Sequence, residues 1–256
     1  MFQPHSFLWH YLWVAPNLLL AILAAILRQH GLKRQFPAIH LYACFEAVQW
    51  AVLYPIDLIP SIPAETFWWA YWLSSVLECI VVFILISDIF ANVFGSYEAL
   101  SHLGKLIIRW AGAFLVVIAA GIAAYAPTEN QRWLIHSTHI LQESMYIVAA
   151  GLILLLFASA AYFRLAWSHQ IFGIALGLGM SVCVHLATWA VMANAGLSDA
   201  GRNLLDFVNM GTFHLAVLIW FYYLLVPHKA AAKPPVSLPE NTLAVWNREL
   251  ERLLQL

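Results

Sequence analysis

The chain has 256 residues, of which 63% are hydrophobic and only 10% are charged. Soluble domains are about 45–50% apolar and about 25% charged, so this composition excludes an ordinary soluble fold and indicates a protein that lies in a lipid bilayer. Because 12 Lys and Arg residues nearly balance 13 Asp and Glu residues, there is no basic excess to indicate nucleic acid as a partner.

Seven apolar segments follow one another along the chain, each near the roughly 20 residues that a membrane-spanning helix needs. Breaks rich in Pro, Gly and polar residues separate them, for example YPIDLIPSIPAE and GSYEALSHLGK. The expected spans are residues 7–27, 38–55, 67–94, 106–125, 133–160, 169–193 and 204–226. The pattern therefore predicts an all-α integral membrane protein, a seven-transmembrane helical bundle, within residues 1–227.

The basic residues are divided unevenly between the two sides that seven spans create. Only Arg132 and Arg202 fall on one side, and the other ten Lys and Arg residues fall on the opposite side or in the tail. Cytoplasmic loops carry the excess of Lys and Arg, so we expect the N-terminus outside and the C-terminus in the cytoplasm. This orientation predicts a multi-pass protein of the cell (inner) membrane.

The segment after Pro227 is expected to leave the membrane, so residues 228–256 form a cytoplasmic linker and a short helix. Within NTLAVWNRELERLLQL, Asn241 or Thr242 can cap a helix whose leucines and Trp246 share one face. An amphipathic C-terminal helix of this kind lies on the inner leaflet or docks onto a protein partner.

Cysteine usage and the first residues of the chain predict neither a disulfide framework nor a leader. Cys44, Cys79 and Cys183 lie far apart in apolar runs without a CxxC pair, which is typical of small buried side chains. The opening MFQPHSFLWHYLW has no basic region and no following cleavage site, so we do not expect a removable signal peptide.

A layer of polar residues is the main functional signal, because ionisable groups at membrane depth are costly. Counted along each helix at about 1.5 Å per residue, these groups fall roughly 13–18 Å below the outer surface or slightly shallower. They are Asn17, Glu46, Glu78, His139, Glu143, His185 and His214. Segment 106–125 contributes none and is expected to be peripheral. We therefore predict a buried polar centre in the outer half of the bundle.

Several chemistries fit this layer. His139 and Glu143 lie four residues apart on one helical face, and with His185 and His214 they form a candidate metal site for zinc or iron. Two of the histidines are instead candidates to hold a non-covalent haem. The layer also fits a purely structural role, in which polar contacts hold the helices together in a subunit of a membrane complex.

The interpretation that we favour is a small-molecule binding or sensory module with an outward-facing cavity, rather than an enzyme. Ligand sites favour aromatic walls beside a few polar groups, and Trp72 belongs to an aromatic rim at the outer ends. The expected ligand contacts are Asn17, Glu46, Trp72, Glu78, His139, Glu143, His185 and His214. A membrane-embedded metal- or haem-dependent enzyme is the alternative.

Overall fold

The structure, a computed structural model, describes residues 6–95, 97–124, 131–165, 167–194 and 198–226, together with residues 248 and 252. Regular structure in these residues is entirely helical, which confirms the predicted all-α class for this part of the chain. The helices are α1 (Phe7–Gln29), α2 (Pro37–Leu58), α3 (Ala64–Phe94), α4 (Glu98–Ala124), α5 (Gln131–Tyr162), α6 (His169–Asn194) and α7 (Asp199–Leu225), with a short 3₁₀ helix η1 (Leu32–Arg34). Apart from Arg248 and Arg252, the predicted C-terminal helix lies outside the described residues.

Two helices begin five or more residues before the predicted spans. Helix α4 begins at Glu98 instead of 106, within the break GSYEALSHLGK, and α7 begins at Asp199 instead of 204. In α4, Gly104 allows a close approach to α3, since an added Cβ would lie 3.1 Å from the Phe94 ring. In α7, the Ser198 side chain caps the helix by accepting a hydrogen bond from the Gly201 N–H at 3.4 Å.

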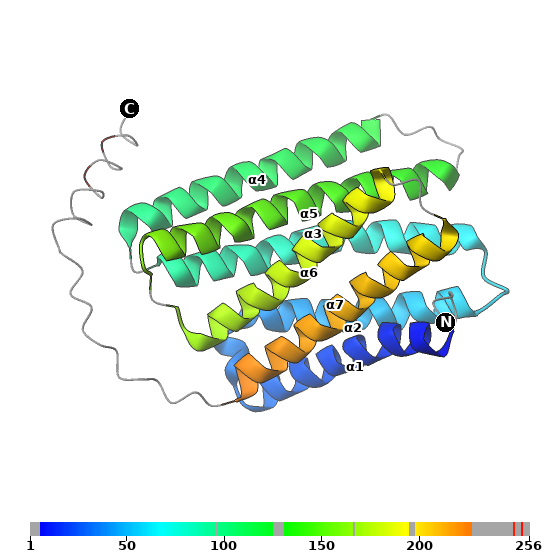
Figure 1. The fold of residues 1–256 in the computed structure, drawn as a ribbon, viewed down its shortest axis with the longest axis horizontal. Helices are drawn as coiled ribbons and strands as arrows, with labels where there is room; N and C mark the ends of the chain where they lie inside the picture. The colour runs from blue at the N-terminus through cyan, green and yellow to red at the C-terminus, as the bar shows by residue number, and fades with distance from the viewer. Residues whose placement is uncertain are drawn as a thin grey trace.

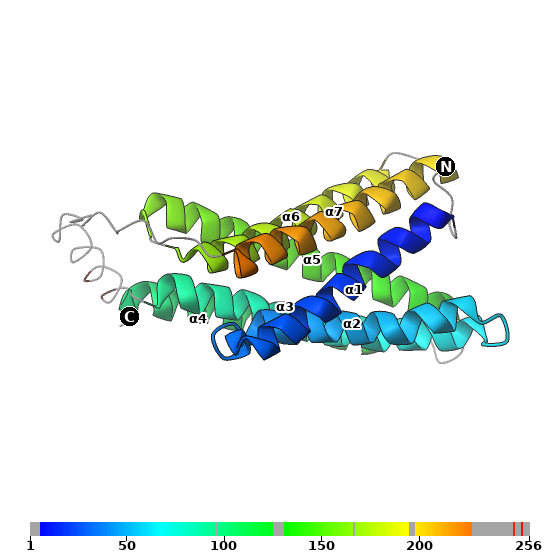
Figure 2. The ribbon, with the colours of Figure 1, turned by 90° about the horizontal axis from the view of Figure 1, so that it is seen from below.

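Six of the helices form a closed ring. In packing order the ring runs α1, α2, α3, α5, α6, α7 and back to α1, while α4 packs outside it against α3 and α5. Figure 1 shows that α1, α3, α5 and α7 all begin at one end, which we call the N-terminal end of the bundle. In Figure 2, α2, α3 and α4 form one layer, α6 and α7 form another, and α1 and α5 run diagonally between them.

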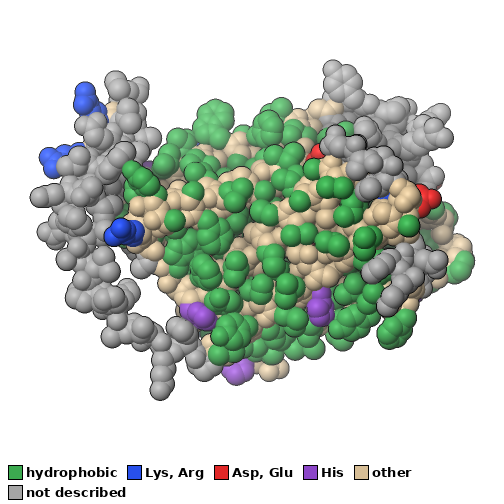
Figure 3. All heavy atoms as spheres, viewed as in Figure 1, with side chains coloured by type: hydrophobic (Ala, Val, Ile, Leu, Met, Phe, Trp, Pro, Cys, Tyr) green, Lys and Arg blue, Asp and Glu red, His purple; other side chains and the backbone are tan. Residues whose placement is uncertain are grey.

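The helices make the chain a multi-pass membrane protein by length and composition. Six of them, all except α2, are long and apolar enough to cross a bilayer. Helix α2 has 22 residues but carries Glu46, Gln49 and Asp57, which lower its hydropathy. Figure 3 shows hydrophobic side chains over the length of one face, with the most prominent Lys and Arg side chains at one end and the visible Asp and Glu side chains at the other.

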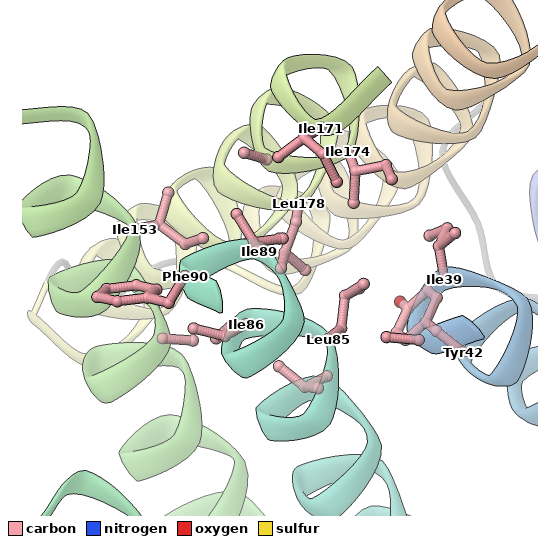
Figure 4. Close-up of a cluster of buried hydrophobic side chains, with 14 of the residues drawn as sticks. Ile39, Tyr42, Leu85, Ile86, Ile89, Phe90, Ile153, Ile171, Ile174 and Leu178 are labelled. Carbon is pink, nitrogen blue, oxygen red and sulfur yellow. The ribbon is translucent and has the colours of Figure 1, made fainter. Parts of the chain in front are cut away.

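The half of the ring away from the N-terminal end is filled by fully buried side chains, which we call the apolar plug. Its members are Leu23, Leu27, Ile39, Leu85, Ile86, Ile89, Ile153, Leu156, Ile174 and Trp220. Figure 4 shows how α2, α3, α5 and α6 bring several of these side chains together. Burial of a large aliphatic side chain contributes about 1.5–3 kcal/mol relative to exposure in water, but within lipid the gain comes from close packing instead.

Glycines on α6 allow α7 to pack closely against it. A Cβ on Gly173 would overlap the Tyr223 side chain, and a Cβ on Gly177 would overlap the Trp220 indole. The buried Trp220 Nε1–H then donates a hydrogen bond to the Ile174 carbonyl oxygen at 3.2 Å. These glycines therefore serve helix packing, as small residues commonly do in membrane helices.

The substitution Gly177→Ala is expected to destabilise the protein, because its methyl group forces Trp220 out of position. Overpacking of this kind costs about 1–3 kcal/mol in the free energy of unfolding. The matched control is Gly151→Ala on α5, where an added Cβ meets nothing within 4 Å. Thermal unfolding in detergent, followed by tryptophan fluorescence, measures the difference. Equal melting temperatures for the two variants would contradict the packing role of Gly177.

Candidate ligand-binding cavity

A partly open cavity of about 280 Å³ lies inside the ring of helices. All six ring helices contribute to its wall, and α4 does not. The lining residues are Leu12, Trp13 and Asn17 of α1, Tyr42, Glu46 and Gln49 of α2, Tyr71, Glu78 and Val82 of α3, Gln142 and Tyr146 of α5, Leu178, Ser181, Val182 and His185 of α6, and Asn209, Met210 and Phe213 of α7. Its volume is near the lower end of the range for small-ligand sites, about 300–1,000 Å³.

The cavity occupies the half of the bundle nearer the N-terminal end. Counted at about 1.5 Å per residue, the lining residues lie roughly 8–27 Å along the helices from that end. Below them the apolar plug begins, and the two regions meet where the Tyr42 ring packs edge-on against Trp220 with 5.5 Å between ring centroids. The bundle is thus polar in one half and apolar in the other.

Helix α1 is irregular at the wall of the cavity. Pro16 lies inside the helix and has no N–H to donate to the Leu12 carbonyl, so one backbone hydrogen bond is missing there. At the next position, the Asn17 side chain donates to the Trp13 carbonyl at 2.8 Å. The Trp13 ring also contacts Tyr54 of α2 at 5.1 Å, which holds this wall against its neighbour.

Two carboxyl groups are the most costly members of the wall. Glu46 lies beside the Tyr42 hydroxyl, and Glu78 lies beside the Gln49 amide and the Tyr146 hydroxyl. The two groups are also near enough to repel each other when both are charged. Glu46 Oε1 and Gln49 Oε1 are buried and have no hydrogen-bond partner. Two residues of the α2 wall therefore each carry a buried, unsatisfied acceptor oxygen.

On the adjoining wall, formed by α3 and α5, neutral polar side chains bond to one another. The Gln142 Nε2–H donates to the Tyr71 hydroxyl at 3.0 Å and lies 3.3 Å from Ser75 Oγ. Ser75 Oγ in turn donates to the Tyr71 carbonyl at 2.8 Å. A second link joins α2 to α3, where the Gln49 amide donates to Ser74 Oγ at 3.2 Å. Hydrogen bonds of this kind hold neighbouring membrane helices in register.

His185 forms the α6 wall together with aromatic neighbours. Its ring lies against the Tyr146 ring with 4.1 Å between centroids, and Trp189 stacks on it at 6.0 Å. The next ring along is His139, which lies 4.9 Å from Trp189. Trp189 therefore stands between the two histidines.

The cavity brings together four of the predicted ligand contacts and leaves four outside its wall. Asn17, Glu46, Glu78 and His185 line it, and His139, Glu143, His214 and Trp72 do not. Glu143 is exposed on the outside of α5. The His214 ring packs against Tyr11 of α1 at 5.7 Å, and the Trp72 ring lies 6.2 Å from Trp69.

The proposed metal ligands do not converge either. Among the described residues, no three His, Cys, Asp or Glu side chains lie close enough together to hold one metal ion. His139, Glu143, His185 and His214 all belong to the described part of the chain. Their arrangement gives no geometric support for a shared metal site.

The sequence interpretation missed most of the neutral polar wall, including Tyr42, Gln49, Tyr71, Gln142 and Tyr146. A signal was available, because Tyr42, Glu46 and Gln49 share helical spacing, as do Tyr71 and Glu78. Extending the face of each predicted acid or histidine by three, four or seven residues would have found these groups. Counting ionisable residues alone did not.

Comparison with protein families, characterised proteins and solved structures finds no match to this chain.

A double-mutant cycle tests whether the hydrogen bond between Tyr71 and Gln142 stabilises the packing of α3 against α5. We expect a double-mutant cycle with Tyr71→Phe and Gln142→Leu to give a coupling energy of about 0.6 kcal/mol, and no more than about 1.7 kcal/mol, as for other membrane-helix contacts. Unfolding of the four proteins in mixed micelles with increasing SDS measures it.

The control cycle pairs Tyr71→Phe with Thr188→Val, whose hydroxyl lies 2.7 Å from Asn209 Oδ1 between α6 and α7. Because these sites do not contact each other, their effects should add within about 0.5 kcal/mol. Additive effects in the Tyr71–Gln142 cycle would show that this bond contributes nothing.

Proposed function

We propose that this chain is a seven-span membrane protein that binds a small polar molecule in the cavity and acts as a binding or sensory module. Its N-terminus lies outside and its C-terminus in the cytoplasm of the cell (inner) membrane. The single observation that carries the proposal is a cavity walled by polar side chains from six helices, in which Glu46 Oε1 and Gln49 Oε1 are buried without partners. Buried polar atoms are nearly always hydrogen-bonded, so these two call for a ligand or ordered water.

The seventh span in this proposal is α2. Its 22 residues extend about 33 Å, which matches a hydrocarbon core of about 30 Å. It packs between α1 and α3, and its Glu46 and Gln49 line the cavity inside the ring. Two of the three polar groups that lower its hydropathy therefore lie at the cavity. A helix of this kind crosses the membrane because the neighbouring helices reduce the contact of its polar side chains with lipid.

The described basic residues support the orientation. Arg28, Lys33 and Arg34 lie at the junction of α1 and α2, and Arg164 follows α5, all at the end opposite the N-terminal end. Arg202 lies at the start of α7, at the N-terminal end. An excess of Lys and Arg marks the cytoplasmic side, which puts the cavity in the outer half.

Sensing is favoured over transport because the inner half of the ring is filled. None of the fully buried side chains of the apolar plug is ionisable, so the plug does not continue a pathway of acids and bases from the cavity toward the opposite end. A route for a conformational signal does exist, since Tyr42 lines the cavity and its ring packs on Trp220, which contacts α6. A ligand that shifts Tyr42 therefore acts on the α6–α7 interface. Output through a partner of the C-terminal helix stays a prediction.

Cysteine labelling tests the span count directly. Gln35 and Ser61 are exposed residues at the two ends of α2. If α2 crosses the membrane, a membrane-impermeant maleimide labels Ser61→Cys in intact cells but labels Gln35→Cys only after permeabilisation. Labelling is read in a background in which the three native cysteines are replaced by alanine. Labelling of both positions from the same side would contradict a seventh span.

Ligand binding is tested by narrowing the cavity. A library of small polar fragments that includes amines, acids, amides and alcohols is screened for a rise in melting temperature. We expect at least one chemical class to stabilise the wild-type protein, since a ligand at 100 times its Kd contributes about 2.7 kcal/mol. Ser181→Phe, which places a ring in the cavity, should abolish the shift.

The matched control is Ser61→Phe, because Ser61 lies in the exposed turn between α2 and α3. This variant should keep the wild-type response to every fragment. The binding proposal fails if no fragment shifts the wild-type protein, or if Ser181→Phe responds as the wild type does.

A further inference from the structure

We infer that the ligand is a small organic cation, a primary or secondary amine whose ammonium group meets the α2 side of the cavity. This inference rests on the proposed binding function and assigns the chemical class of the ligand. It follows from the charge of the wall, the acceptor chemistry of its unsatisfied atoms and the nature of its remaining surface.

The acidic groups of the wall outnumber its basic ones, since His185 of α6 is the one titratable base among the described residues that line it. Glu46 and Glu78 both line the cavity, and none of the described residues that line it is Lys or Arg. A charged group inside a bundle that lies in lipid is costly unless it is paired. An anionic ligand would add to the repulsion, and a neutral ligand would leave it unchanged. A cation supplies the missing opposite charge.

The unsatisfied atoms of the wall are acceptors. Glu46 Oε1 and Gln49 Oε1 are both buried and without a partner, and their residues lie three positions apart on one face of α2. Acceptor oxygens need a donor, and an ammonium group offers two or three N–H donors together with a positive charge. Glu78, which lies beside the Gln49 amide, extends the same acidic side of the wall.

The remaining surface of the cavity suits the carbon body of such a ligand. Aromatic rings from Trp13, Tyr42, Tyr71, Tyr146 and Phe213 line it. Faces of aromatic rings attract organic cations and also pack against hydrocarbon, with a gain that grows when the site is desolvated. A bare metal ion fits less well, because no three metal-binding side chains converge among the described residues and the 280 Å³ volume exceeds what one ion occupies.

Three probes of nearly equal shape test the charge requirement. Tyramine carries an ammonium group, 4-ethylphenol has none, and 4-hydroxyphenylacetate carries a carboxylate. Binding to the full-length wild-type protein in lipid nanodiscs is measured by isothermal titration calorimetry. We expect tyramine to bind at least tenfold more tightly than 4-ethylphenol, and 4-hydroxyphenylacetate not to bind. This comparison needs no variant, so it stands even where a substitution prevents folding.

Charge-removing substitutions then locate the contact. Glu46→Gln and Glu78→Gln keep the size of each side chain and should each weaken tyramine binding at least tenfold. The matched control is Glu143→Gln, since Glu143 is exposed on the outside of α5 and does not line the cavity. Its affinity for tyramine should equal that of the wild type.

The outcomes separate this inference from the proposed function. Equal binding of 4-ethylphenol, tighter binding of 4-hydroxyphenylacetate, or full affinity in both Glu46→Gln and Glu78→Gln would overturn the assignment of a cation. Failure of all three probes would overturn it as well. In each of these cases the fragment screen with Ser181→Phe still decides whether the cavity binds a small molecule at all.

Discussion

The bundle must hold two carboxyl groups, Glu46 and Glu78, inside a structure whose outer surface meets lipid. In that surrounding each group needs hydrogen-bond donors or an opposite charge, because bulk water is not there to supply them. Tyr42 of the same helix provides part of this stabilisation for Glu46, and Gln49 of α2 and Tyr146 of α5 provide it for Glu78. The packing of α3 between α2 and α5 meets this requirement for Glu78. Helix α4 brings no residue to the cavity wall and accordingly packs outside.

A polar centre weakens a bundle unless the rest of it packs closely, and the inner half of the ring meets that need. Small residues on α6 let α7 approach until the Trp220 indole covers Gly177. The same indole donates its one N–H to the Ile174 carbonyl and supports the Tyr42 ring at the floor of the cavity. Trp220 therefore belongs to both regions. It anchors the close-packed half and sets the position of a residue that lines the polar half.

The sequence predicted how far along the helices the polar residues lie better than which way each side chain faces. Hydropathy and helix rise located the polar layer, because the distance along a helix depends only on the residue count. The facing direction changes by about 100° with each residue, so an error of one position turns a side chain from the cavity to the outside. Gln142 lines the cavity whereas Glu143 is exposed, and Phe213 lines it whereas His214 packs against Tyr11. Burial, not charge, decides which neighbour faces inward, and that depends on contacts that no single sequence reveals.

The α3–α5 wall and the α2 wall of the cavity differ in how many of their polar atoms have hydrogen-bond partners. This difference indicates which wall holds the helices together and which binds a ligand. On the α3–α5 side, Tyr71, Ser75 and Gln142 exchange hydrogen bonds among themselves, so that wall is complete without a ligand. On the α2 side, Glu46 and Gln49 keep acceptor oxygens without partners. A polar layer that served only helix packing would not leave an acceptor oxygen of a buried carboxyl group without a partner. The hydrogen bonds of the α3–α5 wall hold the helices in register. The α2 wall keeps unpaired acceptors, so a hydrogen-bond donor on a ligand is stabilised most there.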